Sequence, residues 1–535
     1  VASGGSATTL QEYDAAGRLW KSTAVVSSAN RITETLYDLA DRPTEVIDSA
    51  GKVWTTAYDD AGRVTNTIDP LAGTTTTVYD AVNRVTTAIN AAGDSTNNSY
   101  DAGGRLTSVT DGNSHTTTYQ YDNANRQVSI TKPLASGTGT VTTTYNSAGW
   151  VTGLTNELSK VTTTSYDNVG RKTVVVNPLA IAHTYVYDDA GPCTTQVDRD
   201  GLTTTYTYDK MDRAKSRAFQ TGGSVTYDYD ALGNRTKMVD STGTYTYTYD
   251  DASNLSTVID CHSKALTYTY NEAGENVELA APSTGSTTYT RDLRGNVSHI
   301  TNPHSESSTI SYDDANRMQG IVFGNGAKTS YSLDPAGRTT QVVNRNSSNS
   351  VLSQFDYVLD GVGDRTSSSD TIMGPTVWNY DPSRQLTTDY YYPPVVGTLS
   401  WDDFTLAQWN TFDLDDWNWF VLYSGSRIPG SLTIVYDAAG NRLNKTDPVS
   451  GEVTTYTYDD DNRLVTAEDS SGVTTYSYDN RGNRTGIEEP NSDVTTLVWD
   501  MENRMIQSEL PDGEIIEYSY NADGLLMQKT SNLGA

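Results

Sequence analysis

The sequence predicts an all-β protein in which tandem 21-residue β-hairpin repeats form one spiralling, curled sheet, that is, a hollow shell or tube. Three observations predict this fold class. The dipeptide Tyr-Asp recurs at a fixed interval, a Thr-rich stretch with period-two alternation precedes it, and a turn rich in Gly follows it. Repeats of one supersecondary unit bury their apolar faces against neighbouring units, so they form one extended structure rather than separate domains.

The Tyr of the Tyr-Asp dipeptide sets the length of the repeat. Tyr58, Tyr79, Tyr100 and Tyr121 follow one another at intervals of 21 residues. With Arg, Leu or Trp accepted at degenerate positions, there are 23 copies from Tyr13 onward. The residue after this anchor is Asp in 20 copies and Asn in three.

A β-strand is expected to lead up to each anchor. In residues 203–208 the sequence is Thr-Thr-Thr-Tyr-Thr-Tyr. Period-two alternation places Tyr206 and Tyr208 on the same face of a strand, as it does Tyr456 and Tyr458. β-branched Thr runs disfavour a helix, and the stretch has no 3.6-residue apolar stripe.

A tight turn is expected directly after each anchor. Four residues after it stands Gly in 14 copies, as at Gly62, and Asn or Asp in seven more, as at Asp212. These residue types tolerate a positive φ, which predicts a left-handed position. Asp followed by two variable residues and Gly is typical of a type I turn closed by a Gly bulge. Each anchor therefore ends one strand and opens a hairpin.

A second strand completes the unit, as in residues 106–110, and it ends near another Asp or Asn. Two strands and two turns use one repeat, so 23 repeats predict on the order of 46 strands. Open twisted sheets rarely exceed about ten strands without curling, which predicts a spiral.

The repeat residues favour a structural interpretation over a catalytic one. Asp can accept hydrogen bonds from the turn, and Arg can pair with Asp or stack on Tyr. A catalytic site needs one unique constellation rather than 23 similar copies. The representative repeat residues are Tyr58, Asp59, Gly62, Arg63, Tyr100, Asp101, Gly104, Arg105, Tyr206, Tyr208, Asp209, Arg213, Tyr456, Tyr458, Asp459 and Arg463.

Composition narrows the class of partner. The formal net charge of −30 repels phosphate backbones and anionic membrane surfaces, so we expect no nucleic acid partner. No apolar run is long enough for membrane insertion. The chain begins with Val1 rather than Met, so we expect that a leader or a larger N-terminal portion precedes it.

One segment interrupts the repeats. It spans residues 389–433, between a repeat array at 1–388 and its continuation at 434–535. Trp and Phe recur in it at eight-residue steps, at Trp401, Phe404, Trp409, Phe412, Trp417 and Phe420. One hypothesis is a hydrophobic plug that covers a sheet edge, and the other is an aromatic surface that binds glycan or protein.

The chain carries no motif typical of an enzyme. The five His residues lack metal-ligand spacing, and no phosphate loop or nucleophile elbow is present. We therefore expect no catalytic residue, no resident metal and no cofactor. Asp459 to Asp461 and the segment 198–201 resemble parts of calcium loops without the full ligand spacing, so weak Ca²⁺ binding is the one metal hypothesis.

The repeat resembles the YD-repeat, or Rhs-repeat, superfamily. The pattern Tyr-x-Tyr-Asp-x-x-Gly-Arg-Leu stands almost complete at residues 119–126, 206–213 and 456–464. The resemblance implies a spiral of β-hairpins around a hollow shell, as in bacterial Rhs and toxin-complex cocoons and in animal teneurins. In bacterial members the shell often holds a toxic C-terminal domain that is released by aspartyl self-cleavage at an Asp-Pro-x-Gly-Leu boundary. Here Asp-Pro-Leu-Ala-Gly at residues 69–73 fills an ordinary turn, which does not match that boundary.

Three hypotheses for function follow. The first is a non-enzymatic structural shell or filament element, secreted or at the cell surface of a bacterium, which encapsulates other parts or self-associates into a fibre or coat. The second is an adhesin that binds glycan or protein through the aromatic insertion. The third is the carrier shell of a self-processing polymorphic toxin. The chain itself is expected to be a fragment of a longer protein or a repeat array used as a fibre or coat.

Overall fold

The computed structural model describes residues 8–26, 30–370, 375–391, 430–448 and 450–533. These residues form 46 β-strands that belong to a single sheet. Each strand pairs antiparallel with the next strand in the chain, from β1 with β2 to β45 with β46. The all-β fold with 23 consecutive hairpins is therefore confirmed.

The first 23 strands have the following bounds. They are β1 Thr9–Tyr13, β2 Leu19–Ala24, β3 Arg31–Tyr37, β4 Pro43–Ile47, β5 Val53–Tyr58, β6 Val64–Ile68, β7 Thr74–Tyr79, β8 Val85–Ile89, β9 Ser95–Tyr100, β10 Leu106–Thr110, β11 Thr116–Tyr121, β12 Gln127–Pro133, β13 Thr138–Tyr145, β14 Val151–Thr155, β15 Val161–Tyr166, β16 Lys172–Val176, β17 Ala182–Tyr187, β18 Cys193–Val197, β19 Thr203–Tyr208, β20 Ala214–Phe219, β21 Ser224–Tyr229, β22 Arg235–Asp240 and β23 Gly243–Tyr249.

The other 23 strands continue the same pattern. They are β24 Leu255–Ile259, β25 Ala265–Tyr270, β26 Asn276–Ala281, β27 Gly285–Arg291, β28 Val297–Thr301, β29 Ser307–Tyr312, β30 Met318–Val322, β31 Lys328–Leu333, β32 Thr339–Arg345, β33 Val351–Leu359, β34 Arg365–Asp370, β35 Thr376–Tyr380, β36 Leu386–Tyr391, β37 Gly430–Tyr436, β38 Arg442–Thr446, β39 Val453–Tyr458, β40 Leu464–Asp469, β41 Gly472–Tyr478, β42 Arg484–Glu488, β43 Val494–Trp499, β44 Met505–Glu509, β45 Ile515–Tyr520 and β46 Leu526–Ser531.

The turn after each anchor has the predicted left-handed residue. Gly62 has a φ of 80°, and Asn83, at the equivalent place in the next repeat, has a φ of 69°. The fourth residue after the anchor has a positive φ in all 23 copies, including Ser253 and Arg384, where neither Gly nor Asn stands. The tight turn therefore fixes the backbone even where the residue type does not favour it.

A β-bulge follows each of these turns. In the β5–β6 hairpin, Tyr58 pairs with Val64 while Ala57 pairs with Asn66, so Thr65 is the extra residue. The same register shift recurs at the equivalent place in other hairpins, for example next to Tyr208 and Tyr458. A bulge increases the local twist of a strand, and its repetition helps the sheet to coil.

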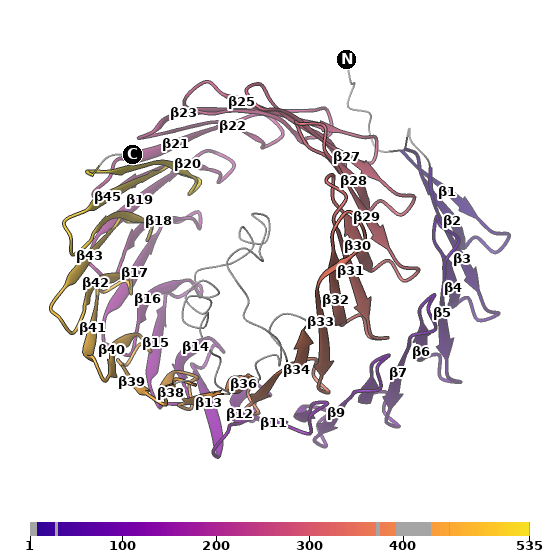
Figure 1. Cartoon of the computed structure of the whole chain (residues 1–535), viewed down its shortest axis with the longest axis horizontal. Coiled ribbons are helices and arrows are strands. Elements are labelled where there is room, and N and C mark those ends of the chain that lie inside the picture. The colour runs from indigo at the N-terminus through magenta and orange to yellow at the C-terminus, as the bar shows by residue number, and fades with distance from the viewer. Residues whose placement is uncertain (1–7, 27–29, 371–374, 392–429, 449, 534–535) are drawn as a thin grey trace.

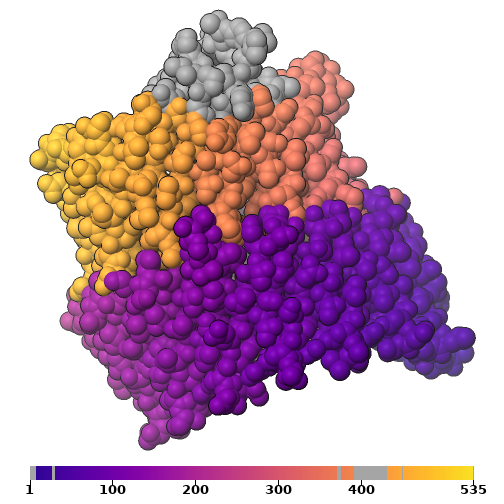
Figure 2. Space-filling model, turned by 90° about the horizontal axis from the view of Figure 1, so that it is seen from below, coloured from indigo at the N-terminus to yellow at the C-terminus, as the bar shows by residue number. Residues whose placement is uncertain are grey.

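The sheet coils into two windings of 23 strands each. The turn between β4 and β5 lies against the turn between β27 and β28, 23 strands further on. The same step separates the β18–β19 turn from the β41–β42 turn. Figure 1 shows β1 to β9 beside β27 to β34, and β13 to β20 beside β38 to β45. In Figure 2 the second winding, in orange and yellow, is stacked on the first winding, in purple.

The length of one winding indicates a hollow interior. Strands lie about 4.8 Å apart, so 23 strands give a circumference of about 110 Å and a diameter of about 35 Å. A layer of inward-facing side chains takes about 5 Å on each side, which leaves a space about 25 Å wide. The strands follow one another around this space in Figure 1.

The sheet has little apolar core. The buried hydrophobic residues of the described part are Val26, Val225, Met238, Tyr245, Tyr247, Val343 and Ile434. So few residues cannot provide the main stabilisation of a chain of 535 residues. The sheet is stabilised instead by backbone hydrogen bonds between consecutive strands and by polar contacts between turns.

The sheet continues across the segment at 389–433. β36 and β37 pair with each other, with Thr388 opposite Thr433 and Tyr391 opposite Gly430. The predicted aromatic series from Trp401 to Phe420 lies outside the described residues. In the part of the chain that the structure describes, no helix has the length and apolar character needed to span a bilayer.

Candidate functional site: repeat turns and the seam between windings

The Asp of each Tyr-Asp dipeptide organises its turn. One carboxylate oxygen of Asp59 accepts hydrogen bonds from the backbone N–H groups of Ala61, at 3.0 Å, and Arg63, at 2.9 Å. The other oxygen accepts a bond from Arg63 Nε at 2.7 Å. The hydrogen bond from the Arg63 side chain, followed by that from its backbone, lowers the pKa of Asp59.

The Arg of one repeat also binds the next repeat. Arg63 Nη1 donates to the backbone oxygen of Asp80 at 3.0 Å, and the guanidinium lies 4.7 Å from the centre of the Tyr79 ring. The hydroxyl of Tyr79 donates back to the backbone oxygen of Val64 at 3.0 Å. These contacts form a ladder along one rim of the sheet, which accounts for the Tyr, Asp and Arg of the motif.

The other representative residues occupy the same positions in their own turns. Nε to Oδ2 distances are 2.7 Å for Arg105 and Asp101, 2.7 Å for Arg213 and Asp209, and 2.6 Å for Arg463 and Asp459. Gly104 has a φ of 84°. Tyr100 and Tyr208 donate to backbone oxygens of the preceding hairpin, at 2.8 and 2.7 Å. Tyr206 stands opposite Arg217, and Tyr456 opposite Ala467, in the strand that follows.

A second form of the turn has Asn where Arg would stand. Asn234 Nδ2 donates to Asp230 Oδ2 at 2.9 Å, so the amide replaces the guanidinium. Arg235 then lies on the strand, with its guanidinium 4.6 Å from the centre of the Tyr247 ring. The repeats with Arg one residue later therefore use Arg for a different contact.

The two windings meet along a seam. We call the seam the line along which the Tyr-Asp turns of the second winding contact the opposite rim of the first winding (Figure 2). Arg31 forms two hydrogen bonds with Glu275, 244 residues later, at 2.7 and 2.6 Å. Arg294 Nε lies 2.6 Å from Asp48 Oδ2, and both side chains are largely buried. The ion pairs Lys52–Asp314 and Arg338–Asp94 continue the seam.

Backbone meets backbone at one point of the seam. A Cβ atom added to Gly112 would collide with the backbone oxygen of Gly361, and one added to Gly361 would collide with that of Gly112. Asn113 Nδ2 donates to Asp360 at 2.8 Å, and its oxygen accepts from the N–H of Gly361 at 2.9 Å. Glycine at both positions therefore allows the two rims to touch.

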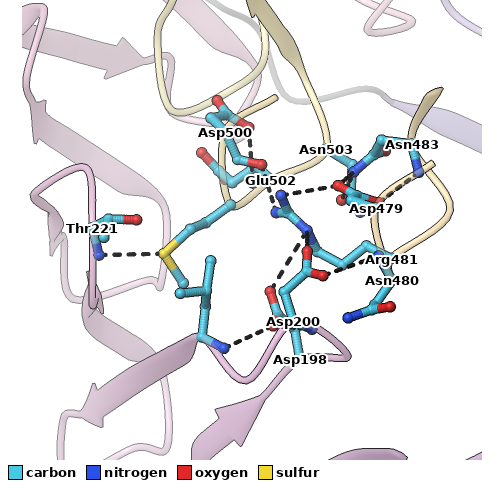
Figure 3. A network of polar contacts seen from close by, with 12 residues as sticks. Asp198, Asp200, Thr221, Asp479, Asn480, Arg481, Asn483, Asp500, Glu502 and Asn503 are labelled. Atoms are coloured by element: carbon cyan, nitrogen blue, oxygen red, sulfur yellow. Dashed lines mark hydrogen bonds and ion pairs between the residues drawn. The ribbon is translucent and has the colours of Figure 1, made fainter. Parts of the chain in front are cut away.

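Arg481 is the centre of a network of polar contacts in the part of the seam that follows the insertion, as Figure 3 shows. Its Nε lies 2.6 Å from Asp200 Oδ2, and its Nη1 donates to the backbone oxygen of Asp500 at 2.7 Å. Asp479 is 3.2 Å away and Asp198 is 3.8 Å away. Arg481 and Asp200 are 281 residues apart, whereas Arg31 and Glu275 are 244 residues apart. The separation is larger here because residues 392–429 lie between the two windings in the sequence and add no described strand.

The segments that resembled calcium loops meet at this part of the seam. Asp200 is bound by Arg481, and Asp461 is bound by Asn177 and lies 3.8 Å from Arg199. Within the described ranges, no three His, Cys, Asp or Glu side chains form a group that could hold a metal ion. Asp200 and Asp461 therefore serve as partners of Arg and Asn side chains from the other winding.

A cavity of about 470 Å³ lies beside Arg481. Its wall includes the stacked rings of His183 and Tyr185, whose centres are 4.5 Å apart. Burial lowers the pKa of His183, and burial raises the pKa of Tyr206 in the same wall. The pKa of Glu502, which pairs with Arg217 at 2.6 Å, is also raised by burial. The cavity is open to solvent on one side and is lined by residues of both windings.

The last hairpin docks through both apolar and polar contacts. Ala522 and Met527 pack against the cluster formed by Val225, Met238, Tyr245 and Tyr247. Asp523 pairs with Arg235 at 2.6 Å and accepts a hydrogen bond from the Tyr247 hydroxyl at 3.2 Å. Burial opposes the ionisation of Asp523, but the hydrogen bond and the charge of Arg235, together with the hydrogen bond from Tyr247, outweigh it, and the pKa of this carboxyl is lowered.

Sequence reasoning indicated the contacts of Asp and Arg within the repeat but missed the seam. Seam residues such as Arg31, Glu275 and Arg481 are not part of the repeat consensus, and they lie more than 240 residues from their partners across the seam. One signal was available. We call the residue two positions after the Asp or Asn that opens a Tyr-Asp turn the tip of that turn. In several turns the tip is charged, and all five of these turns occur in the second half of the chain. The charged tips are Arg294, Asp461, Arg481, Glu502 and Asp523.

The family of the chain follows from comparison with known proteins. The RHS Repeat model matches residues 37–74, 58–95, 100–136, 187–217, 436–474 and 458–494, and the Teneurin YD-shell model matches residues 231–357. The chain belongs to the RHS-repeat, or YD-repeat, superfamily. No curated protein matches this RHS-repeat chain.

Solved structures share its fold. The crystal structure of TcdB2-TccC3-TEV superposes with a TM-score of 0.69 at 15% identity, over 98% of this chain and 31% of that chain. TcdB2-TccC3 gives a TM-score of 0.68 at 15% identity, over 98% of this chain and 32% of that one. The Photorhabdus luminescens Tc holotoxin pore gives a TM-score of 0.58 at 15% identity, over 98% and 31% of the two chains. The RHS-repeat chain thus spans about a third of the length of these structures.

Proposed function

We propose that the chain forms the wall of a hollow carrier shell that encloses a polypeptide within a larger, secreted bacterial assembly. The observation that carries this proposal is the seam. Contacts from Arg31–Glu275 to Asp240–Ala522 join the two windings along the whole length over which they overlap. A spiral sheet whose windings are joined forms a continuous wall, whereas a spiral whose windings do not touch leaves a gap between them.

The related structures support the larger assembly. One of them is a Tc holotoxin pore, and the others combine TcdB2 with TccC3. Because this chain spans about a third of each related chain, further parts are expected to supply the cargo and the remaining wall. Among the hypotheses raised by the sequence, the toxin carrier shell is therefore favoured over a filament or an adhesin.

The width of the interior limits the cargo. A folded domain of 100 residues has a radius of gyration of about 13 Å, hence a diameter of about 34 Å. The interior is about 25 Å wide, so a domain of this size would fit only in an unfolded or partly folded state. The wall itself is proposed to be non-enzymatic, because its polar residues are repeated contacts rather than one catalytic constellation.

Electron microscopy of the purified chain tests the shell. End-on views are expected to show a ring with a centre of low density. A uniformly dense particle would contradict the shell, and long fibres would favour the filament hypothesis instead.

Protease protection tests the enclosed polypeptide. An unfolded reporter segment fused after Ala535 is expected to be digested much more slowly than the free reporter, because the interior is narrower than a folded protease. Digestion at the rate of the free reporter would contradict encapsulation by this part of the wall.

A further inference from the structure

The two faces of the sheet differ in exposure. We call the face that carries the anchor Tyr the Tyr face. In β15, Thr162 and Thr164 lie on the Tyr face and are half-buried, whereas Thr163 between them is exposed. β39, β41 and β43 show the same alternation. Side chains crowd together on the concave side of a curled sheet and spread apart on its convex side, so the Tyr face is the inner face of the wall.

The charged residues of strands β37 to β46 are divided between these faces. Nine residues of the ten strands are charged. All four cations lie on the Tyr face, because each stands opposite an anchor or the residue two before an anchor. They are Arg442, Lys445, Arg484 and Lys529. All four Glu lie on the outer face, because each occupies or stands opposite the position three before an anchor. They are Glu468, Glu488, Glu509 and Glu517.

Two acids lie on the Tyr face at the margins of this region. Asp469, the last residue of β40, accepts hydrogen bonds from the backbone N–H and the hydroxyl of Ser471 in its own turn. Asp389, in the neighbouring β36, stands opposite Trp378, and burial raises the pKa of its carboxyl. Neither acid stands opposite one of the four cations. This part of the wall is therefore cationic inside and acidic outside.

The inner cations contact aromatic rings rather than carboxylates. The guanidinium of Arg484 lies 4.6 Å from the centre of the Tyr476 ring, and Arg442 and Lys529 lie 5.4 and 5.8 Å from equivalent rings. Stacking on Tyr accounts for the position of these side chains and leaves their charge without a counter-ion among the described residues. The cations of these hairpins that form ion pairs in the described structure lie in turns and are Arg463, Arg481 and Arg504.

A cationic inner face stands against the overall charge of −30. From β38 to β46 it extends over eight strand spacings, about 38 Å, along the wall seen in Figure 1. A concave surface lined by one sign of charge concentrates its field in the space that it encloses. The carboxylates of the neighbouring seam turns are used within the wall, as when Asp437 accepts hydrogen bonds from the backbone and the side chain of Asn441.

We infer that the Tyr face of β37 to β46 binds an acidic, unfolded polypeptide as the cargo of the shell. The inference rests on the proposed function and adds the chemistry of the cargo to it. Asp and Glu of the cargo supply the missing counter-ions, and its apolar side chains pack on the Tyr rings. Leu464 and Ile487 lie on the same face, which favours a polypeptide over a phosphate backbone.

Two unfolded, fluorescently labelled peptides of equal length test the charge of this face. They share Ser, Gly and Leu, and they differ in having Glu or Lys at the remaining positions. Fluorescence anisotropy measures their binding to the intact chain at low salt. The net charge of −30 opposes binding of the Glu peptide elsewhere on the molecule, so its binding identifies a local cationic surface. We expect the Glu peptide to bind, and added salt to weaken its binding.

Substitutions locate the bound Glu peptide. The inner variant, Arg442→Gln, Lys445→Gln, Arg484→Gln and Lys529→Gln, is expected to weaken binding about tenfold or more. The control removes four cations from the outer face, as Lys21→Gln, Lys237→Gln, Lys328→Gln and Arg345→Gln, and is expected to weaken binding less than about twofold. Arg442→Lys with Arg484→Lys keeps the charge and is expected to retain binding. Circular dichroism of each variant verifies that the sheet is intact.

Four results would overturn the inference. The first two are failure of the Glu peptide to bind the intact chain, and equal weakening by the inner variant and the control. The third is tighter binding of oligothymidylate than of the Glu peptide, which would assign the face to nucleic acid. The fourth concerns residues 392–429, which include five Asp and one Arg. Binding that appears only when Asn-Gly replaces this segment, between the paired Tyr391 and Gly430, would assign the face to the segment itself.

The proposed function is tested separately. A ring in electron micrographs, together with any of these four results, would leave the shell in place and remove only the acidic cargo. A uniformly dense particle would remove the shell, and the inference with it.

Discussion

Arg481 and Asp200 lie 281 residues apart in the sequence and form a 2.6 Å ion pair between the two windings. Arg481 also contacts the backbone of Asp500, so one side chain joins three turns of the sheet (Figure 3). Both charged groups are largely buried, with side-chain exposures of 11% and 21%. The seam therefore depends on a few side chains that have no equivalent in most repeats.

Replacement of Arg481 by Gln is expected to loosen the seam locally. Removal of one partner of a buried ion pair leaves the other charge without compensation and costs ~3 kcal/mol. Hydrogen exchange in the turns at 198–201 and 479–482 should accelerate by about 100-fold. The control is Arg345→Gln, since Arg345 lies at the outer rim and contacts only a backbone oxygen, that of Asn349, at 3.4 Å in the described contacts. Equal exchange in both variants would contradict the role of Arg481.

Replacement of Gly112 by Ala is expected to separate the rims at their closest contact. The added Cβ would collide with the backbone of Gly361, which cannot move away as a flexible side chain does. Exchange of the Gly361 amide, which is bound to Asn113, should accelerate, while turns several hairpins away should not change. Gly103→Ala, in a Tyr-Asp turn of the first winding away from the seam, is the control, because its nearest neighbour is the Asp101 side chain at 3.3 Å. Unchanged protection of Gly361 would show that the windings do not touch there.

Two substitutions at Gly62 separate backbone strain from loss of space. Gly62 has a φ of 80°, and an added Cβ would meet nothing closer than Arg42 at 3.6 Å. Ala is therefore expected to cost ~1 kcal/mol through its backbone alone. Asn is expected to cost less, because Asn83 already occupies the equivalent position with a φ of 69°. Exchange of the Gly62 amide should rank Ala above Asn above Gly, and any other order would contradict the explanation.

Acid is expected to destabilise the ladder. The hydrogen bonds from Arg lower the pKa of Asp14, Asp38 and Asp59 from the ordinary value of 3.8. A carboxyl with a lowered pKa in the folded state stabilises the fold above 3.8, and this stabilisation is lost as the pH falls through the folded-state value. Burial raises the pKa of Glu502, so protonation of this carboxyl favours the folded state as the pH falls. This effect comes from one group, whereas the Asp residues of the ladder form a series along the rim.

Thermal unfolding at low salt measures this effect. The melting temperature should fall between about pH 5 and about pH 2, and added salt should reduce the difference, because these carboxylates are partly open to solvent. A melting temperature that is constant or rises over this range would show that the ladder does not contribute to stability.

The local structure of the repeat could be predicted from the sequence. The 21-residue interval, the alternation of Thr and Tyr, and Gly, Asn or Asp four residues after the anchor specify the strands and the left-handed turn residue. These features depend on interactions within a few residues, as when Asp59 binds the N–H groups of its own turn. The pairing of Arg63 with Asp59 follows from the same short spacing.

The number of strands in a winding was decided by the tertiary structure alone. Each strand adds a small twist, and 23 of these increments must accumulate before the β4–β5 turn reaches the β27–β28 turn. A small change in each increment would bring another turn opposite Asp48, so no short sequence pattern specifies that Arg294 is its partner. For the same reason, the sequence determined the repeating hairpin, while the coiling of the whole sheet decided which tips became a seam and which became an exposed rim.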